Sequence, residues 1–92
     1  PTICKFFGIT VRMYYDDHAP PHFHAYYGDH EAILDSLTLS EGTLPRRALN
    51  LISEWATIHR QELLTNWQLA EQHLPLLPID PLEKRYEQTY KS

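Results

Sequence analysis

The chain has few of the features that would place it in a membrane or in an oxidising compartment. Its 92 residues include a single cysteine, Cys4, which excludes an internal disulfide and argues against a cysteine-rich zinc site. No stretch approaches the roughly 18 apolar residues that a membrane-spanning helix requires. The first residues also lack the basic segment and the long apolar segment of a secretory signal. We therefore expect a cytoplasmic protein with no membrane partner.

Positive charge is also scarce. Eight Lys and Arg residues stand against twelve Asp and Glu residues, and the formal net charge is −4 at pH 7 with neutral histidines. Proteins that bind nucleic acid over a broad surface are usually basic. The charge balance therefore argues against an extended phosphate-binding surface, although it is compatible with a local basic site.

What the chain does contain suits one small globular domain. Apolar residues make up 42% of the sequence and aromatic residues 12%, which is too hydrophobic for a disordered chain. We expect residues 1–74 to form a single α+β domain. Residues 75–92 are expected to form a proline-punctuated tail, with a short helix that follows Asp80 and ends near Tyr90.

The two halves of the domain have different periodicities. Stretches with strand chemistry, which are rich in β-branched and aromatic residues, occupy positions 3–7, 9–15, 22–27, 31–35 and 37–39. From Pro45 to about His73 no glycine or proline interrupts the chain, and apolar residues recur with helical spacing. This second pattern predicts one long helix, or two with a break near His59 and Arg60.

Strands followed by helices predict an α+β fold. We expect a small antiparallel sheet of about four or five short strands, with a long or broken helix packed on one face and the short C-terminal helix beyond it.

Residues 16–27 are the most informative segment, with the sequence Asp-Asp-His-Ala-Pro-Pro-His-Phe-His-Ala-Tyr-Tyr. Three of the six histidines fall within seven positions: His18, His22 and His24. Histidine exchanges protons near neutral pH, and its neutral ring is a common metal ligand. The aspartates and prolines predict a turn over residues 16–21.

Strand parity predicts which of these side chains share a face. Alternate residues of the strand 22–27 point to opposite sides, and the apolar set must face the core. If the strand 9–15 pairs with it, the same parity applies there, because a one-residue slip would bury a charge. The predicted surface cluster consists of Arg12, Tyr14, His22, His24 and Tyr26.

Three interpretations of this cluster are open from the residues alone. In the first, His22 and His24 act as general acid and base on a phosphodiester, Arg12 holds the phosphate, and Tyr14 and Tyr26 contact the substrate or stack on a base.

In the second interpretation the imidazoles bind Zn²⁺ or another transition metal. The ligands would be His22 and His24, with His18 or Asp17 as the third, and the nearby carboxylates could ligate the metal or orient a ring. In the third, the histidines are ordinary exposed strand residues and Pro20-Pro21 only stiffens a turn.

The order of motifs resembles that of a family of small bacterial domains of unknown function. The most specific shared element is an Asp-His-x-Pro-Pro-His-Phe-His block. The matching segments of this sequence are Pro1–Ile3, Phe7–Ile9, Met13–Tyr15, Asp17–His24, Leu44–Leu49, Trp55, His59 and Glu62–Trp67. The resemblance covers nearly everything up to residue 73.

The resemblance implies a genetic context but no established reaction. Genes of this family resemble one half of two-gene toxin–antitoxin cassettes, which implies a toxin-like component with an antitoxin-like partner. We expect a histidine-dependent, metal-independent endoribonuclease with RNA as substrate and without a cofactor. The alternatives are a metal-binding protein and a non-enzymatic protein-interaction module that uses the helices and the tail. A homo-oligomer is compatible with each of these.

Overall fold

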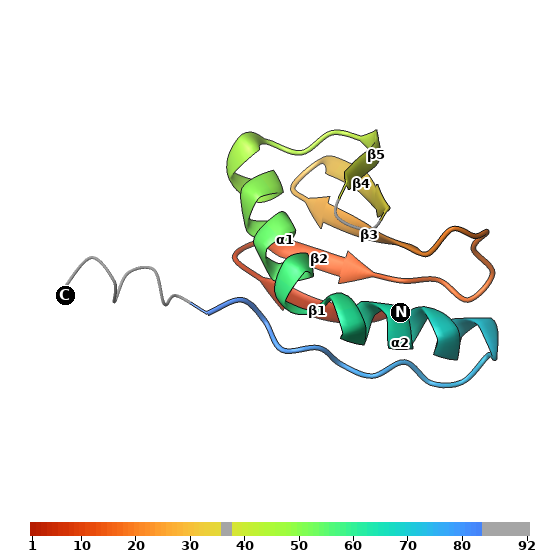
Figure 1. The fold of residues 1–92 in the computed structure, drawn as a ribbon. Helices are drawn as coiled ribbons and strands as arrows, with labels where there is room; N and C mark the ends of the chain where they lie inside the picture. The colour runs from red at the N-terminus through yellow and green to blue at the C-terminus, as the bar shows by residue number, and fades with distance from the viewer. Residues whose placement is uncertain (36–37, 84–92) are drawn as a thin grey trace.

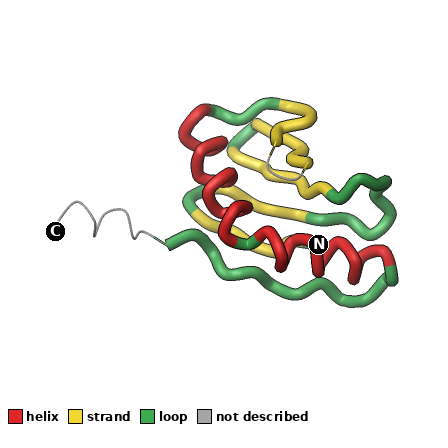
Figure 2. The backbone as a smooth tube through the Cα atoms, in the orientation of Figure 1, coloured by secondary structure: helices red, strands yellow, loops and turns green. Residues whose placement is uncertain are grey.

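The computed structural model describes residues 1–35 and 38–83, which form a five-stranded antiparallel sheet followed by two helices (Figure 1). The strands lie in the sheet in chain order: β1 (Thr2–Phe6), β2 (Ile9–Arg12), β3 (His22–Tyr27), β4 (His30–Asp35) and β5 (Thr38–Gly42). Figure 2 marks the strands and the two helices along the backbone, and the residue colours of Figure 1 show that the strands come first. The α+β class expected from the sequence is confirmed.

The second strand is shorter than its sequence pattern predicts. The stretch expected to run to Tyr15 leaves the sheet after Arg12, whose partner on β3 is His24. The amide of Met13 instead donates to the carbonyl of Pro1, 3.1 Å away. The chain is then free to form the long turn that leads into β3.

The helical half consists of α1 (Arg46–Ile58) and α2 (Arg60–Glu71), which are joined at His59. The expectation of one long or broken helix is therefore corrected to two separate helices. His59 has φ −108° and ψ 24°, which departs from helical values and redirects the chain (Figure 1). Its amide ends α1 by donating to Trp55, and its carbonyl begins α2 by accepting from Leu63.

The core is centred on Trp55 of α1, which is fully buried. Its ring stacks on Phe6 of β1 with centroids 5.5 Å apart and meets Phe23 of β3 edge-on at 6.1 Å. Burying an aromatic ring of this size is among the largest single contributions to the stability of a small domain. Within the part of the chain that the structure describes, neither helix is long and apolar enough to cross a bilayer.

The segment after α2, residues 74–83, runs back along the molecule beside β1 (Figure 1). The amide of Ile79 donates to the carbonyl of Ile3, and the indole N–H of Trp55 donates to the carbonyl of Asp80. Ile79 and Leu82 are buried in the core. Residues 80–83 are not helical, and the rest of the short helix expected near Tyr90 lies outside the described residues.

Asn66 of α2 anchors this returning segment through hydrogen bonds to Leu77. It is buried, and its side-chain amide bonds both the N–H and the C=O of Leu77 at 2.8 Å. These two bonds replace a backbone partner for a segment that has no regular secondary structure. Asn66 is thus the one buried polar side chain among the described residues that the core needs to satisfy.

Replacing Asn66 by alanine is expected to lower the free energy of unfolding by about 1–3 kcal/mol, because two backbone groups of Leu77 lose their partners. Urea denaturation followed by circular dichroism measures this loss. Gln68→Ala, an exposed change on the same helix, is the matched control and should change stability by less than about 0.5 kcal/mol. Equal losses in the two variants would contradict the role of Asn66.

Gly42 and Gly28 form a second matched pair. Both have positive φ, +79° and +56°, but a Cβ at Gly42 would lie 2.1 Å from the carbonyl oxygen of Glu31, whereas Gly28 faces open space. We expect Gly28→Ala to cost roughly 1–2 kcal/mol from the left-handed backbone alone. Gly42→Ala should lower the free energy of unfolding clearly more in the same experiment. Equal losses in the two variants would show that β4 and β5 can move apart enough to accept the Cβ.

Candidate metal and acid–base site

Strand β3 presents the histidines on the side of the sheet opposite to the core. Phe23 and Ala25 are buried, whereas His22, His24 and Tyr26 are only partly buried. The predicted antiparallel pairing of the second and third strands is present. The packing of Phe23 and Ala25 therefore determines the direction of the histidine side chains.

The other members of the predicted cluster lie next to His24. The ring of Tyr14 meets the ring of His24 edge-on at 4.8 Å, and the hydroxyls of Tyr14 and Tyr26 are 2.7 Å apart. The guanidinium of Arg12 lies 5.4 Å from the centroid of the Tyr26 ring. The structure thus brings Arg12, Tyr14, His24 and Tyr26 together on one surface. Burial raises the pKa of Tyr26, helped by its bond to Tyr14, so this hydroxyl stays protonated.

Asp17 joins the two histidines. The Nε2 atoms of His22 and His24 both lie 3.0 Å from the same oxygen, Oδ2 of Asp17. Side-chain exposure is 15% for His22, 12% for His24 and 27% for Asp17, so all three are largely shielded from water. One ligand atom from each residue falls within 4.8 Å of the others. Of the described residues, these three form the group whose spacing suits a metal ion.

The proton positions at His22 follow from its second nitrogen. Nδ1 lies 2.9 Å from the carbonyl oxygen of Pro20, which can only accept, so Nδ1 carries a proton. A neutral His22 then has a lone pair on Nε2 that faces the carboxylate of Asp17 at 3.0 Å. Two acceptors at this distance repel each other unless a proton or a metal cation lies between them.

His24 shows a related imbalance. Its Nδ1 is buried and has no hydrogen-bond partner among the described residues, and the nearest carboxylate oxygen, Oε2 of Glu31, is 3.7 Å away. If Nε2 donates to Asp17, a neutral ring leaves an unpaired lone pair on the buried Nδ1. If Nδ1 carries the proton, Nε2 presents a lone pair to Asp17, as His22 does. The second arrangement points the lone pairs of both rings at one place.

The structure does not bring His18 into this group. The residue is exposed, and it has no hydrogen bond, ion pair or ring contact within residues 1–35 and 38–83. The sequence offers His18 or Asp17 as the third ligand beside the two imidazoles, and it is Asp17 that lies next to them. In a turn without periodicity, neighbouring residues can point in unrelated directions, so no pattern distinguished the two.

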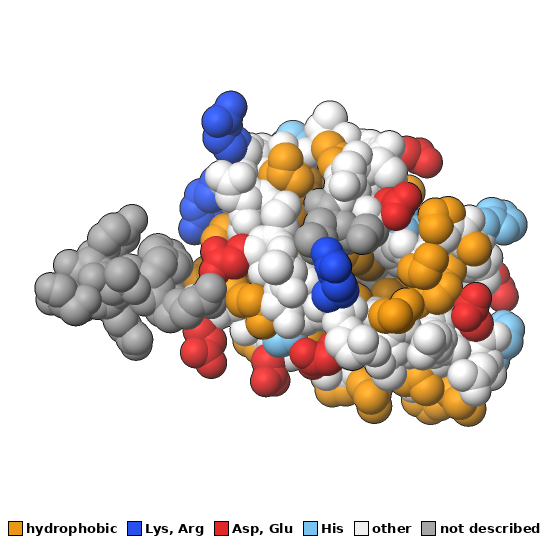
Figure 3. Space-filling view, viewed as in Figure 1, with side chains coloured by type: hydrophobic (Ala, Val, Ile, Leu, Met, Phe, Trp, Pro, Cys, Tyr) orange, Lys and Arg blue, Asp and Glu red, His pale blue; other side chains and the backbone are white. Residues whose placement is uncertain are grey.

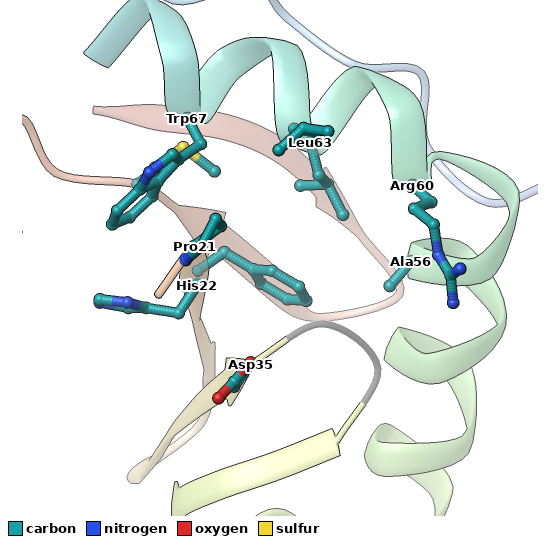
Figure 4. A pocket seen from close by; sticks show the side chains of 10 residues that line it. Pro21, His22, Asp35, Ala56, Arg60, Leu63 and Trp67 are labelled. Carbon is teal, nitrogen blue, oxygen red and sulfur yellow. The ribbon is translucent and has the colours of Figure 1, made fainter. Parts of the chain in front are cut away.

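A pocket beside the cluster was not anticipated from the sequence. Its lining includes His22, Trp67 and Arg60 from α2, and Asp35 from the end of β4 (Figure 4). The rings of His22 and Trp67 are 5.1 Å apart. Asp35 was predictable in principle, because it is the cross-strand partner of His22, but Arg60 carries no such signal.

Comparison with known protein families matches residues 8–68 to a family described as a domain of unknown function, DUF4160. No curated protein and no solved structure matches the chain. The matched segment contains the whole histidine block and both tryptophans, and it spans more than half of the sequence. The chain therefore belongs to the DUF4160 family.

Proposed function

We propose that the protein binds a divalent transition-metal ion through Asp17, His22 and His24 and uses it as a hydrolytic centre. The observation that carries this proposal is the convergence of both Nε2 atoms on one oxygen of Asp17, each at 3.0 Å. A cation between these atoms replaces repulsion between lone pairs with three favourable contacts. Two imidazoles and a carboxylate, with further positions open, are the donor set of many catalytic Zn²⁺ sites.

The two distances from Asp17 to the imidazoles need little adjustment to accept Zn²⁺. With metal–ligand distances of roughly 2.0–2.2 Å, ligand atoms at a tetrahedral metal lie about 3.3 Å apart. The observed 3.0 Å separations are therefore a few tenths of an ångström short. The bond from Nδ1 of His22 to Pro20 is the kind of contact that holds a ligating imidazole in the required tautomer.

The substrate class that we propose is a phosphodiester, with RNA as the first substrate to test. A metal ion in such a site polarises a phosphoryl oxygen and activates water as a nucleophile. Arg12, opposite His24 in the sheet register, supplies a cation for the phosphate. Tyr14 and Tyr26 form a shielded aromatic surface beside it for a base or ribose.

The metal-independent ribonuclease uses the same residues but fits the geometry less well. That mechanism needs one accessible ring nitrogen to take a proton from the substrate and another to give one to the leaving group. Here both Nε2 atoms face Asp17, and Nδ1 of His24 is buried. The carboxylate of Asp17 occupies the space between the two imidazoles in which a phosphate would have to lie.

The toxin-like role and the antitoxin-like partner belong to the same proposal and rest on the motif resemblance. Exposed apolar side chains support a contact with a partner or a second copy: among the described residues these are Ile58, Leu64, Leu74 and Leu77. Hydrophobic side chains gather at several places on the face that the helices present (Figure 3). Co-purification with the product of the neighbouring gene tests this part.

Metal binding by the purified protein is the first test. Elemental analysis and titration with Zn²⁺ or Co²⁺ should give one equivalent for the wild type, and tetrahedral Co²⁺ should show visible absorption bands. Asp17→Ala, His22→Ala and His24→Ala should each weaken binding by roughly 100-fold or more, since each removes a ligand. His18→Ala is the matched control and should bind as the wild type does. A wild type without stoichiometric metal would overturn the proposal.

RNA cleavage in the presence and absence of a chelator is the second test. We expect cleavage by the Zn²⁺-loaded protein, its loss in chelator and its return with added Zn²⁺. Arg12→Gln should raise KM about 10-fold and leave metal affinity unchanged, because Arg12 contacts the phosphate rather than the metal. Cleavage that persists in chelator and disappears in His22→Ala would instead establish the metal-independent mechanism.

A further inference from the structure

The pocket beside His22 has a volume of about 240 Å³ and lies between the two helices, the start of β3 and the end of β4 (Figure 4). Its walls are mainly apolar: Met13, Pro21, Phe23, Ala56, Leu63, Leu64 and Trp67. Pockets for drug-sized ligands span roughly 300–1,000 Å³. A single flat ring system therefore suits this pocket better than a whole nucleotide or a peptide.

Two opposite charges line the pocket without neutralising each other. Arg60 reaches from the first turn of α2, and Asp35 ends β4 on the other side of the opening (Figure 4). No ion pair joins them, and neither has another hydrogen-bond or ion-pair partner among the described residues. Arg60 is exposed and Asp35 is only partly buried, so water can reach both charged groups, and both are accessible to a ligand that carries complementary edges.

The ligand that matches these groups is a flat ring with a paired donor edge and a paired acceptor edge. Guanine has both: N1–H and the 2-amino group can donate to one carboxylate, and O6 with N7 can accept from a guanidinium in the bidentate arrangement that Arg prefers. Adenine lacks the paired donor edge and the O6 acceptor. Cytosine and uracil are smaller and lack the N7 acceptor. Trp67 supplies an aromatic surface against which such a ring can pack.

His22 connects this pocket to the candidate metal centre. The centroid of its ring lies 5.1 Å from that of Trp67 and 5.5 Å from that of His24. A base in the pocket would therefore place its attached ribose and phosphate beside Asp17, His22 and His24. We infer that the pocket between Asp35 and Arg60 is a guanine-binding site that selects the nucleotide at the scissile phosphodiester. This inference rests on the proposed phosphodiester activity and adds its base specificity.

Binding of the four ribonucleoside 5′-monophosphates, followed by two-dimensional NMR with a metal chelator present, tests the inference without using catalysis. GMP should bind at least about 10-fold more tightly than AMP, CMP or UMP and should shift the indole resonance of Trp67. Asp35→Asn and Arg60→Gln should each remove most of that preference. Arg47→Gln and Asp29→Asn, at exposed positions elsewhere, are the charge-matched controls and should retain it.

The outcomes separate the two proposals. A preference for GMP that depends on Asp35 and Arg60 supports the pocket assignment even if the protein binds no metal. Equal binding of the four nucleotides, or no binding at millimolar concentration, overturns the guanine site and leaves the metal centre untouched. A GMP preference that survives both substitutions places the base elsewhere and overturns the assignment to this pocket.

Discussion

The alternation of side chains along β3 is the constraint on which both the core and the candidate site depend. Phe23 and Ala25 point to the side on which Trp55 packs, so His22 and His24 must point to the other. Shifting the strand by one residue would bury both imidazoles and expose Phe23. The hydrophobic free energy that stabilises the sheet thus also orients the two rings, without any separate interaction for that purpose.

The third member of the site is held by contacts from a different part of the chain. Asp17 lies in the turn between β2 and β3, and residues on either side of it contact α2 and the chain just after α2. The ring of Tyr15 stacks on His73 with centroids 6.1 Å apart, and Trp67 packs on His22. The site therefore depends on the helical half as much as on the sheet.

What the sequence predicts well is what depends on periodicity. The two-residue period of the strands predicts one surface cluster of Arg12, Tyr14, His22, His24 and Tyr26. The structure shows direct contacts among Arg12, Tyr14, His24 and Tyr26. The sequence does not determine that β2 ends at Arg12, nor whether the helical half is one helix or two. Both depend on where the chain must turn to pack its elements.

The site residues that depend on tertiary packing were harder to find. Asp17 was identified only as an alternative to His18, since adjacent residues of an irregular turn carry no pattern that separates them. Arg60 belongs to the pocket only because α2 begins where α1 ends, over the start of β3. The segment that contains Ile79 and Leu82 has the composition of a tail. Its burial follows from long-range contacts with Ile3 of β1 and Trp55 of α1, which no local sequence pattern indicates.

The net charge of −4 bears on the proposed substrate, because a polyanion is repelled by an acidic protein at long range. At physiological ionic strength this repulsion is screened over about 8 Å, so the charges nearest the site decide binding. Arg12 lies beside His24, Arg60 lines the pocket beside His22, and the proposed metal ion lies between the two histidines. The proposed metal site would then be locally positive on an acidic protein. This favours binding around one phosphodiester over binding along an extended length of nucleic acid.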